Sequence, residues 1–365
     1  MSGPSLSELL DDLRSLVDVE SPSLDVPAVT ASATAVAQLV ERRLGSPAEL
    51  VDGPVGPHVV WRGGGAPRIL VVGHHDTVFP VGTLTTRPFT VADGQATGPG
   101  VFDMKAGIVI AVHAIAALPD PSGVELLMTC DEEVGSTTSR QLIEERAAAC
   151  GVALVLEPAA DGALKVGRKG TGTFEVVVRG RAAHAGLEPE RGVNALVEAS
   201  HQVLAITAFA DPSRGTTVTP TVAHAGTADN VVPAEARVRV DVRVTEPAEG
   251  IRLEAAMAAL APVDPAATLE IFGGVNRPPM PESATAELFA LASKVAVELG
   301  LPELRGVAVG GGSDGNFTAA VGVPTLDGLG ATGAGAHADH EHVIVDELPD
   351  RVRLLTGLMD ALQHR

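Results

Sequence analysis

The feature that most constrains this fold is a series of short, mainly apolar segments separated by helical segments in the first half of the chain. Strand-like segments occupy 69–72, 124–129 and 153–156, and helical segments at 104–118 and 139–149 stand between them. Strands that are apolar on both faces are typical of a parallel sheet covered by helices on both sides. The pattern predicts an α/β domain with a mostly parallel sheet, whose functional groups gather beyond the carboxyl ends of the strands.

A different pattern begins near residue 167 and ends at a proline-rich segment, 278–281. Its segments follow the order β-α-β-β-α-β: 171–179, 192–207, 216–225, 234–245, 248–261 and 267–273. This order predicts a ferredoxin-like α+β sandwich with one sheet face free. The helical pattern returns at 283–299. We therefore predict a domain at 168–277, inserted into a discontinuous domain formed by 1–167 and 278–365.

Composition excludes several classes of partner. The chain has 365 residues, which suits two domains, and a formal net charge of −20. Such a field repels nucleic acid and anionic membrane surfaces. Two cysteines form no disulfide framework, the N-terminus lacks the features of a signal peptide, and no apolar run approaches the ~20 residues of a membrane span. We expect a cytoplasmic protein with a small-molecule substrate.

Polar side chains follow each predicted strand of the first domain. They are His74, Asp76, Asp103, Glu132, Glu133 and Glu157, and the late segment GAGAHADHEHV adds His337. Each has an ordinary alternative reading. His74 could be a turn residue, the glutamates could be solvated loop acids, and His337 could belong to a casually chelating His-rich tract. Asp103 could be the N-cap of the helix that follows it.

Together these residues favour a metal site. Two histidines and three or four carboxylates are the ligands that suit zinc and other divalent first-row ions. Five candidate ligands exceed what one tetrahedral catalytic site with a water can use. If one carboxylate bridges, two ions can share a hydroxide about 3.5–4 Å apart. The pattern therefore favours a pair of metals over one.

Five motifs, GHHDTV, GPGVFDMKAG, TCDEEVGS, LEP and GAHADHEHV, occur in an order and spacing that resemble the dizinc aminoacylase/carboxypeptidase metallopeptidase family. That family includes bacterial glutamate carboxypeptidase, acetylornithine deacetylase and succinyl-diaminopimelate desuccinylase. The segments HDTVFPVGT, DMKAG and GRAAHAG are most similar to the glutamate carboxypeptidase branch. The resemblance covers essentially the whole chain. It implies two divalent metal ions, zinc first of all, with Co²⁺ or Mn²⁺ able to substitute.

The resemblance also implies roles at matching positions. Asp103 would bridge both metals. One metal would also bind His74 and Glu157. The other would also bind Glu133 and His337.

Two further residues of the same motifs would support catalysis. Asp76 would orient the ring of His74, as carboxylates commonly do for metal-bound histidines. Glu132 would be the general base that takes a proton from the metal-bridging water and passes it to the leaving nitrogen. His75 has no implied role and is expected to bind nothing.

The inserted domain would be a lid and dimerisation domain, so a homodimer is implied. His184, in GRAAHAG, would reach the partner's active site and stabilise an oxyanion. Asn230 and Arg277 would hold the substrate carboxylate, and Gly312 would belong to a glycine-rich substrate loop. The ordinary alternatives are a turn histidine, a surface arginine and a loop without a ligand.

The resulting hypothesis is a two-metal hydrolase of amide bonds in small substrates with a free carboxylate, similar to glutamate carboxypeptidase. A deacylase or desuccinylase of a biosynthetic intermediate would use the same residues and differ only in specificity. A binding protein without catalysis is a third hypothesis. Such a protein should have lost a ligand or the base, and no such loss is seen in the motifs.

Overall fold

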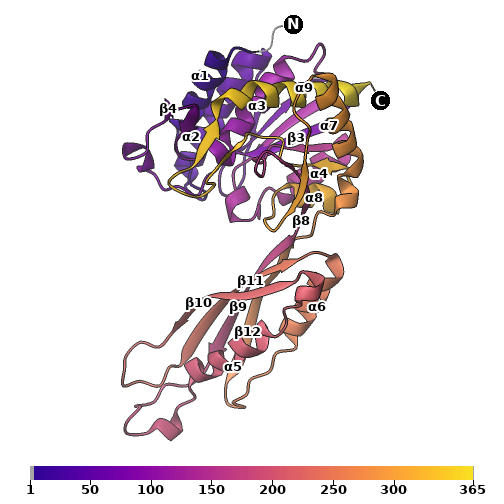
Figure 1. The fold of residues 1–365 in the computed structure, drawn as a ribbon. Coiled ribbons are helices and arrows are strands. Elements are labelled where there is room, and N and C mark those ends of the chain that lie inside the picture. The colour runs from indigo at the N-terminus through magenta and orange to yellow at the C-terminus, as the bar shows by residue number, and fades with distance from the viewer. Residues whose placement is uncertain (1–3, 365) are drawn as a thin grey trace. The chain divides into compact units, whose positions relative to one another are not determined.

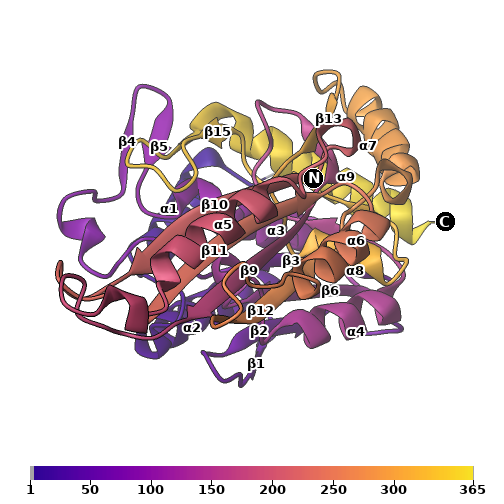
Figure 2. The same cartoon turned by 90° about the horizontal axis from the view of Figure 1, so that it is seen from below.

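The chain folds into two compact units (Figures 1 and 2). The structure, a computed structural model, describes residues 4–364. The first unit comprises the chain up to Gly167, then Met280–Val309 and the chain from Ser313 onward. The second comprises Arg168–Pro279 together with Gly310–Gly312.

The first unit is built on a six-stranded sheet with the order β1-β2-β6-β3-β7-β14. These strands are β1 (Glu49–Val51), β2 (His58–Arg62), β3 (Ile69–His74), β6 (Val124–Thr129), β7 (Ala153–Val155) and β14 (Thr325–Leu326). β3 is parallel to both β6 and β7, and β14 is parallel to β7. β1 and β2 add antiparallel pairings at one edge. The predicted α/β fold with a mostly parallel sheet is confirmed.

Helices cover both faces of this sheet. They are α1 (Leu6–Val17), α2 (Val26–Leu44), α3 (Ala106–Ala116), α4 (Arg140–Cys150), α7 (Ala286–Glu298), α8 (Gly315–Ala320) and α9 (Leu348–Gln363). Because side chains alternate along a strand, Val71 belongs to a core cluster that includes residues of α1, α2, α3, α7 and α9, whereas Val72 belongs to a separate cluster with residues of α4 and α8. Burial on both faces explains why these strands lack a polar alternation.

Two smaller sheets complete the first unit. One has the order β15-β16-β5-β4 and the other pairs β13 with β8. Their strands are β4 (Thr90–Ala92), β5 (Gln95–Thr97), β8 (Leu164–Arg168), β13 (Gly306–Val309), β15 (Gly333–Ala334) and β16 (His342–Ile344). β15 and β16 are antiparallel neighbours, so the loop between them, 335–341, projects from one hairpin.

The second unit is a ferredoxin-like sandwich. Its elements are β9 (Gly170–Arg179), α5 (Ala195–Thr207), β10 (Thr217–Ala225), β11 (Glu235–Val244), α6 (Pro247–Ala258) and β12 (Thr268–Arg277). The antiparallel sheet has the order β10-β11-β9-β12. Alternate valines of β11, such as Val238 and Val240, are buried in a core with the two helices, while Arg239 between them is exposed. The predicted β-α-β-β-α-β order is confirmed.

No helix within residues 4–364 is both long enough and apolar enough to cross a membrane.

Candidate metal centre

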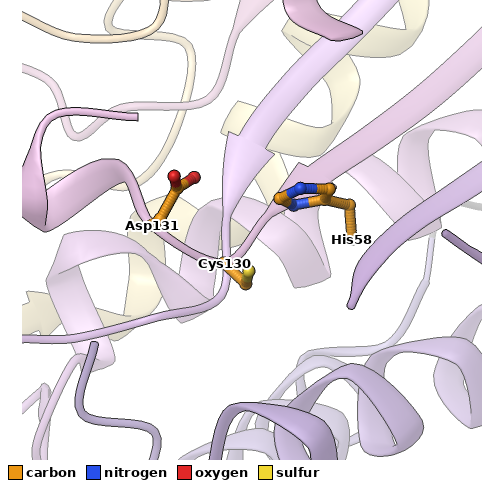
Figure 3. Close-up of side chains that lie close together, drawn as sticks. All are labelled: His58, Cys130 and Asp131. Carbon is orange, nitrogen blue, oxygen red and sulfur yellow. The ribbon is translucent and has the colours of Figure 1, made fainter. Parts of the chain in front are cut away.

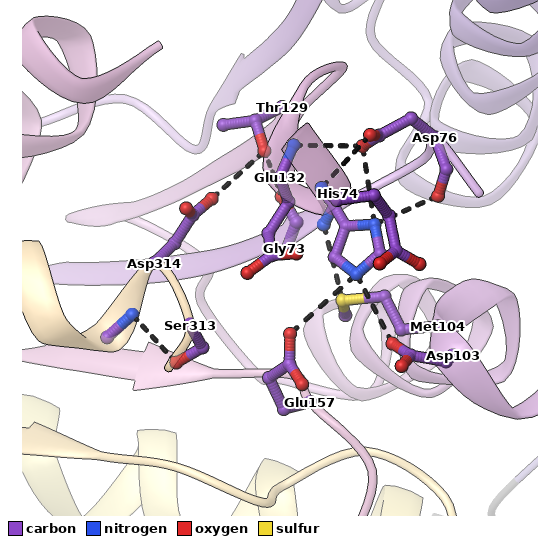
Figure 4. Close-up of polar contacts among 12 residues, drawn as sticks. Gly73, His74, Asp76, Asp103, Met104, Thr129, Glu132, Glu157, Ser313 and Asp314 are labelled. Carbon is purple, nitrogen blue, oxygen red and sulfur yellow. Dashed lines mark hydrogen bonds and ion pairs between the residues drawn. The ribbon is translucent and has the colours of Figure 1, made fainter. Parts of the chain in front are cut away.

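Three neighbouring parallel strands deliver candidate ligands to one edge of the sheet (Figure 4). β3 ends at His74, and Asp76 follows two residues later. β6 is followed by a short 3-10 turn, Glu132–Val134, and β7 is followed within two residues by Glu157. Because the strands run in the same direction, their carboxyl ends meet, as the sequence predicts.

Asp103 reaches the same place by another route. It lies in a π-turn, Val101–Lys105, that leads into α3. The alternative reading of Asp103 as a helix N-cap is wrong, because the N-cap residue of α3 is Lys105 and no side chain caps this helix. The Asp103 carboxylate is instead directed toward His74 (Figure 4).

The two oxygens of Asp103 face two different histidines. Oδ1 lies 3.3 Å from Nε2 of His74, and Oδ2 lies 3.3 Å from Nε2 of His337. Each histidine also has a second carboxylate nearby. Nε2 of His74 lies 3.7 Å from Oε1 of Glu157, and Nε2 of His337 lies 3.0 Å from Oε2 of Glu133. The structure thus brings all five predicted ligands together around one central carboxylate.

The donor atoms of this cluster suit cations. Nδ1 of His74 lies 2.9 Å from the carbonyl oxygen of Asp76, which places the proton of the neutral ring on Nδ1 and the lone pair on Nε2. Among residues 4–364, Nε2 of His74, Oδ1 of Asp103 and Oε1 of Glu133 are buried without a hydrogen-bond partner. Buried lone pairs that face each other need a proton or a metal ion between them. The residues present therefore fit divalent metal ions.

The pKa values of the cluster also indicate that its carboxylates favour a positive charge nearby. Burial alone lowers the pKa of His74, but Asp103 and Asp76 raise that pKa well above its ordinary value overall. Hydrogen bonds to Asp103 and Glu133 raise the pKa of His337 to about 10. Burial raises the pKa of Asp103, yet His337 and His74 outweigh it and lower that pKa overall. In the metal-free chain, protons on the histidines thus supply the charge that bound cations would supply.

Asp76 connects His74 to the Glu132–Val134 turn. Its carboxylate accepts hydrogen bonds from the Ser23 hydroxyl at 2.6 Å and from the backbone N–H groups of Glu132 and Glu133 at 3.2 Å each. Oδ1 of Asp76 also lies 3.3 Å from Nδ1 of His74. The side chain is fully buried. Asp76 therefore sets the position of His74 and of the two glutamates at once.

Asp314, at the start of α8, braces the other side of the same turn. Its Oδ2 accepts a hydrogen bond from the Thr129 hydroxyl at 3.0 Å, and its Oδ1 accepts one from the Ser136 hydroxyl at 2.5 Å. Thr129, which Figure 4 shows beside Asp314, and Ser136 flank the 130–135 segment. The backbone that carries Glu132 is therefore held at both ends.

Glu341 is a site residue that sequence reasoning missed. Its buried carboxylate accepts hydrogen bonds at 2.9 Å from the backbone N–H groups of Gly100, Phe102 and Asp103. Burial raises the pKa of Glu341 to about 7, although these N–H donors act in the opposite direction. Since Glu341 lies four residues after His337, one loop both presents His337 and holds the Asp103 turn. The only sequence signal was that spacing within GAHADHEHV.

His75 takes no part in the cluster. Its ring is fully buried, and Nε2 lies 3.1 Å from the carbonyl oxygen of Pro57. Burial lowers the pKa of His75 to about 4, so the ring is neutral near pH 7. This placement agrees with the expectation that His75 is not a ligand.

The remaining predicted residues lie in the second unit, in two groups. His184 and Asn230 are on adjacent segments, since Ala185 N–H donates to the Asn230 carbonyl at 2.9 Å; both side chains belong to exposed residues. Arg277, at the end of β12, is buried and lies next to Gly312. A Cβ added to Gly312 would come within 2.9 Å of Cγ2 of Thr171 and within 3.1 Å of Cδ of Arg277, so the loop approaches both side chains closely.

The fold and this cluster fit a class, the metal-dependent hydrolases. Residues 70–361 match the model of Peptidase family M20/M25/M40, and the chain belongs to that family. The resemblance found in the motifs is confirmed, and with it a metal-dependent hydrolase of amide bonds.

Curated relatives agree at the level of sequence. The chain is 33% identical over 325 residues to carboxypeptidase G2 of Pseudomonas sp. (strain RS-16), a match that covers 84% of this chain and 77% of that protein. It is 31% identical over 322 residues to succinyl-diaminopimelate desuccinylase of Rhizorhabdus wittichii, covering 82% of this chain and 83% of that protein.

Solved structures agree at the level of the fold. An M20 family metallo-carboxypeptidase from Sulfolobus solfataricus superposes with a TM-score of 0.79 at 17% identity, covering 99% of both chains. The aminopeptidase PepT from Bacillus cereus superposes with a TM-score of 0.75 at 20% identity, covering 98% of this chain and 99% of that one.

Proposed function

We propose that this chain is a carboxypeptidase-type hydrolase with two divalent metal ions, zinc first of all, that cleaves the amide bond of small substrates bearing a free carboxylate. One observation carries the proposal. The two oxygens of Asp103 face His74 on one side and His337 on the other, each at 3.3 Å. This is the arrangement expected of a carboxylate that bridges two ions, with Glu157 completing one set and Glu133 the other.

Two bound ions would polarise the scissile carbonyl and lower the pKa of an attacking water. The protein then has to move a proton, and a carboxylate oxygen of Glu132, which lies within 4.8 Å of ligand atoms of His74 and Glu157, supports giving this task to Glu132. Its backbone is fixed by the 3.2 Å hydrogen bond to Asp76, and the residue is only 8% exposed. We assign Glu132 the transfer of a proton from the water to the nitrogen that leaves.

Asp76 supplies a first prediction. Asp76→Asn should weaken zinc binding by about 10-fold, the low end of the range for residues that orient a metal ligand, because the backbone carbonyl of residue 76 still contacts Nδ1 of His74. Competition with a chromogenic chelator measures this affinity. Ser23→Ala, which removes only one hydrogen bond to Asp76, is the matched control and should weaken zinc binding less than Asp76→Asn does. An unchanged zinc affinity in Asp76→Asn would contradict the assigned role.

His184 is proposed to stabilise the oxyanion. Its Nδ1 accepts hydrogen bonds from the backbone N–H groups of Gly186 and Leu187, each at 3.1 Å. The proton of the neutral ring therefore lies on Nε2, and in this exposed residue that N–H is able to donate to a developing negative charge. Asn230 and Arg277 are proposed to hold the substrate carboxylate and Gly312 to shape the substrate loop.

We further propose that the second unit joins two copies of the chain into a homodimer, with His184 serving the partner's site. β10 is an edge strand, and α5 exposes Leu196, Val197 and Leu204, whose exposed fractions are 49%, 52% and 72%. Edge strands and apolar faces of this kind commonly pair with another chain. A protein that sediments as a monomer at assay concentrations would contradict this role of His184.

The location proposed is the cytoplasm. Both cysteines, Cys130 and Cys150, are buried and unpaired, as is usual where thiols are kept reduced.

A deacylase or desuccinylase is the second candidate. A relative named as a desuccinylase matches more than four fifths of this chain, as does the relative named as a carboxypeptidase. A panel of N-acetyl, N-succinyl and peptidyl amino acids separates the two candidates. We expect activity only in metal-loaded protein, with chelation abolishing it and Zn²⁺, Co²⁺ or Mn²⁺ restoring it. Preference for a C-terminal glutamate or aspartate would favour the carboxypeptidase. A preparation that binds no metal and cleaves nothing would revive the hypothesis of a binding protein.

A further inference from the structure

A second group of metal-binding side chains lies on the side of β6 where β2 begins (Figure 3). His58 is the first residue of β2, and Cys130 and Asp131 follow β6 directly. One ligand atom from each lies within 4.8 Å of the other two. None of the three belongs to the set around Asp103, although Asp131 immediately precedes Glu132.

The three side chains are completely enclosed. His58 is 3% exposed, and Cys130 and Asp131 are 0% exposed. Within residues 4–364, Nδ1 of His58 and Oδ1 of Asp131 are buried without a hydrogen-bond partner. A buried carboxylate oxygen without a donor is costly, and ligand atoms of Asp131, Cys130 and His58 lie within 4.8 Å of one another.

Hydrogen bonds hold Cys130 and Asp131 in place but leave one oxygen of Asp131 without a donor. Oδ2 of Asp131 accepts hydrogen bonds from the backbone N–H of Thr138 at 2.7 Å and from its hydroxyl at 2.8 Å, which leaves Oδ1 to point elsewhere. The Cys130 thiol donates a hydrogen bond to the carbonyl oxygen of Gly56 at 3.2 Å, and it gives up this bond when the sulfur binds a metal ion. Carboxylate ligands of metals are typically hydrogen-bonded through their second oxygen in this way.

The chemistry of the set selects the ion. A thiolate, an imidazole and a carboxylate form a mixed S, N, O donor set that suits Zn²⁺, whereas Mg²⁺ and Ca²⁺ take oxygen ligands. With Cys130 as thiolate and Asp131 as carboxylate, a divalent ion makes the enclosed group electrically neutral. Burial then carries no uncompensated charge.

We propose that His58, Cys130 and Asp131 bind one zinc ion at a site separate from the catalytic pair, with a water able to take the fourth tetrahedral position. On binding, the Cys130 thiol releases its proton to solvent and a sulfur–metal bond forms. The ion would fix the backbone at residues 130–131 and so hold the adjoining Glu132 and Glu133 in position. Its role would be structural, because the three ligands are buried and none of them belongs to the set around Asp103.

The test is cobalt titration of the metal-free protein under reducing, anaerobic conditions. A thiolate bound to Co²⁺ gives a ligand-to-metal charge-transfer absorption in the near ultraviolet, which the all-nitrogen-and-oxygen set around Asp103 cannot give. This readout therefore does not depend on the proposed catalytic pair. We expect the wild-type protein to show the band and to take up three equivalents of metal.

The two cysteines of the chain provide matched variants. Cys150→Ser leaves Cys130 as the only thiol, so it should keep the band and all three equivalents. Cys130→Ser should lose the band and bind two equivalents. If Cys130→Ser does not fold, the band in Cys150→Ser alone still assigns the sulfur. The proposal would be overturned by a wild-type protein without the band, the result expected if the cluster holds only water. It would also be overturned if the band were lost in Cys150→Ser or survived in Cys130→Ser.

Discussion

Replacing Glu132 with glutamine should lower kcat by about 10²–10⁴-fold while leaving the metal content unchanged. Glutamine keeps the size of the side chain and the backbone hydrogen bond to Asp76, but its amide cannot take a proton from water. A loss of this size corresponds to roughly 3–5 kcal/mol of transition-state stabilisation. Steady-state kinetics on the best substrate of the panel, together with elemental analysis of bound zinc, measure both quantities.

Two comparisons make the result specific. Glu303→Gln changes an exposed glutamate of the same unit and should leave both turnover and metal content at the wild-type level. Glu132→Asp keeps a carboxylate on a side chain that is one methylene shorter. Its kcat should therefore lie between those of Glu132→Gln and the wild type. If Glu132→Gln turns over at nearly the wild-type rate, the proton is moved by another group and the assigned mechanism is wrong.

The core of the fold was predictable from sequence because its signals are local. β3, β6 and β7 are mainly apolar and the intervening helices are amphipathic or wholly apolar, so both the elements and their burial follow from periodicity. The alternation in β11 likewise predicted a half-buried antiparallel strand. Strands of two or three residues, such as β14 and β15, have no periodicity to detect and depend on tertiary pairing.

Convergence of the strand ends explains why a cluster was predictable. His74, Glu132 and Glu157 follow strands that are parallel neighbours, so knowing the strands is enough to place the side chains near one another. Asp103 was ambiguous because an aspartate before a helix is usually a cap. Only the tertiary position of the Val101–Lys105 turn resolves that ambiguity.

Residues that act through backbone contacts were beyond sequence reasoning. An acidic residue in a His-rich tract is usually solvated, and nothing in the sequence shows that Glu341 points at N–H groups 238 to 241 residues away. The same holds for His58 and Cys130, which are 72 positions apart in the numbering and meet only because β2 pairs with β6.

Glu341→Gln should reduce both the stability of the protein and its affinity for zinc. The carboxylate now accepts three N–H donors, one on Oε2 and two on Oε1. Glutamine has a single acceptor oxygen. Its NH₂ group would therefore lie against at least one of these N–H groups, and because both are donors, that N–H would lose its hydrogen bond. Leaving such buried donors unsatisfied costs about 1–3 kcal/mol in the free energy of unfolding. Denaturant unfolding of the metal-free protein measures this loss.

The effect on zinc separates a positioning role from a merely structural one. If Glu341 sets the Asp103 turn, zinc affinity should fall by about 10–100-fold, and kcat should fall even at saturating zinc because Asp103, the proposed bridging carboxylate, is displaced. Glu303→Gln again provides the exposed control. A variant that is less stable but binds zinc and turns over like the wild type would show that Glu341 only supports the fold. Such a result would also mean that the Asp103 turn keeps its position without the hydrogen bonds to Glu341, although the same loop carries His337.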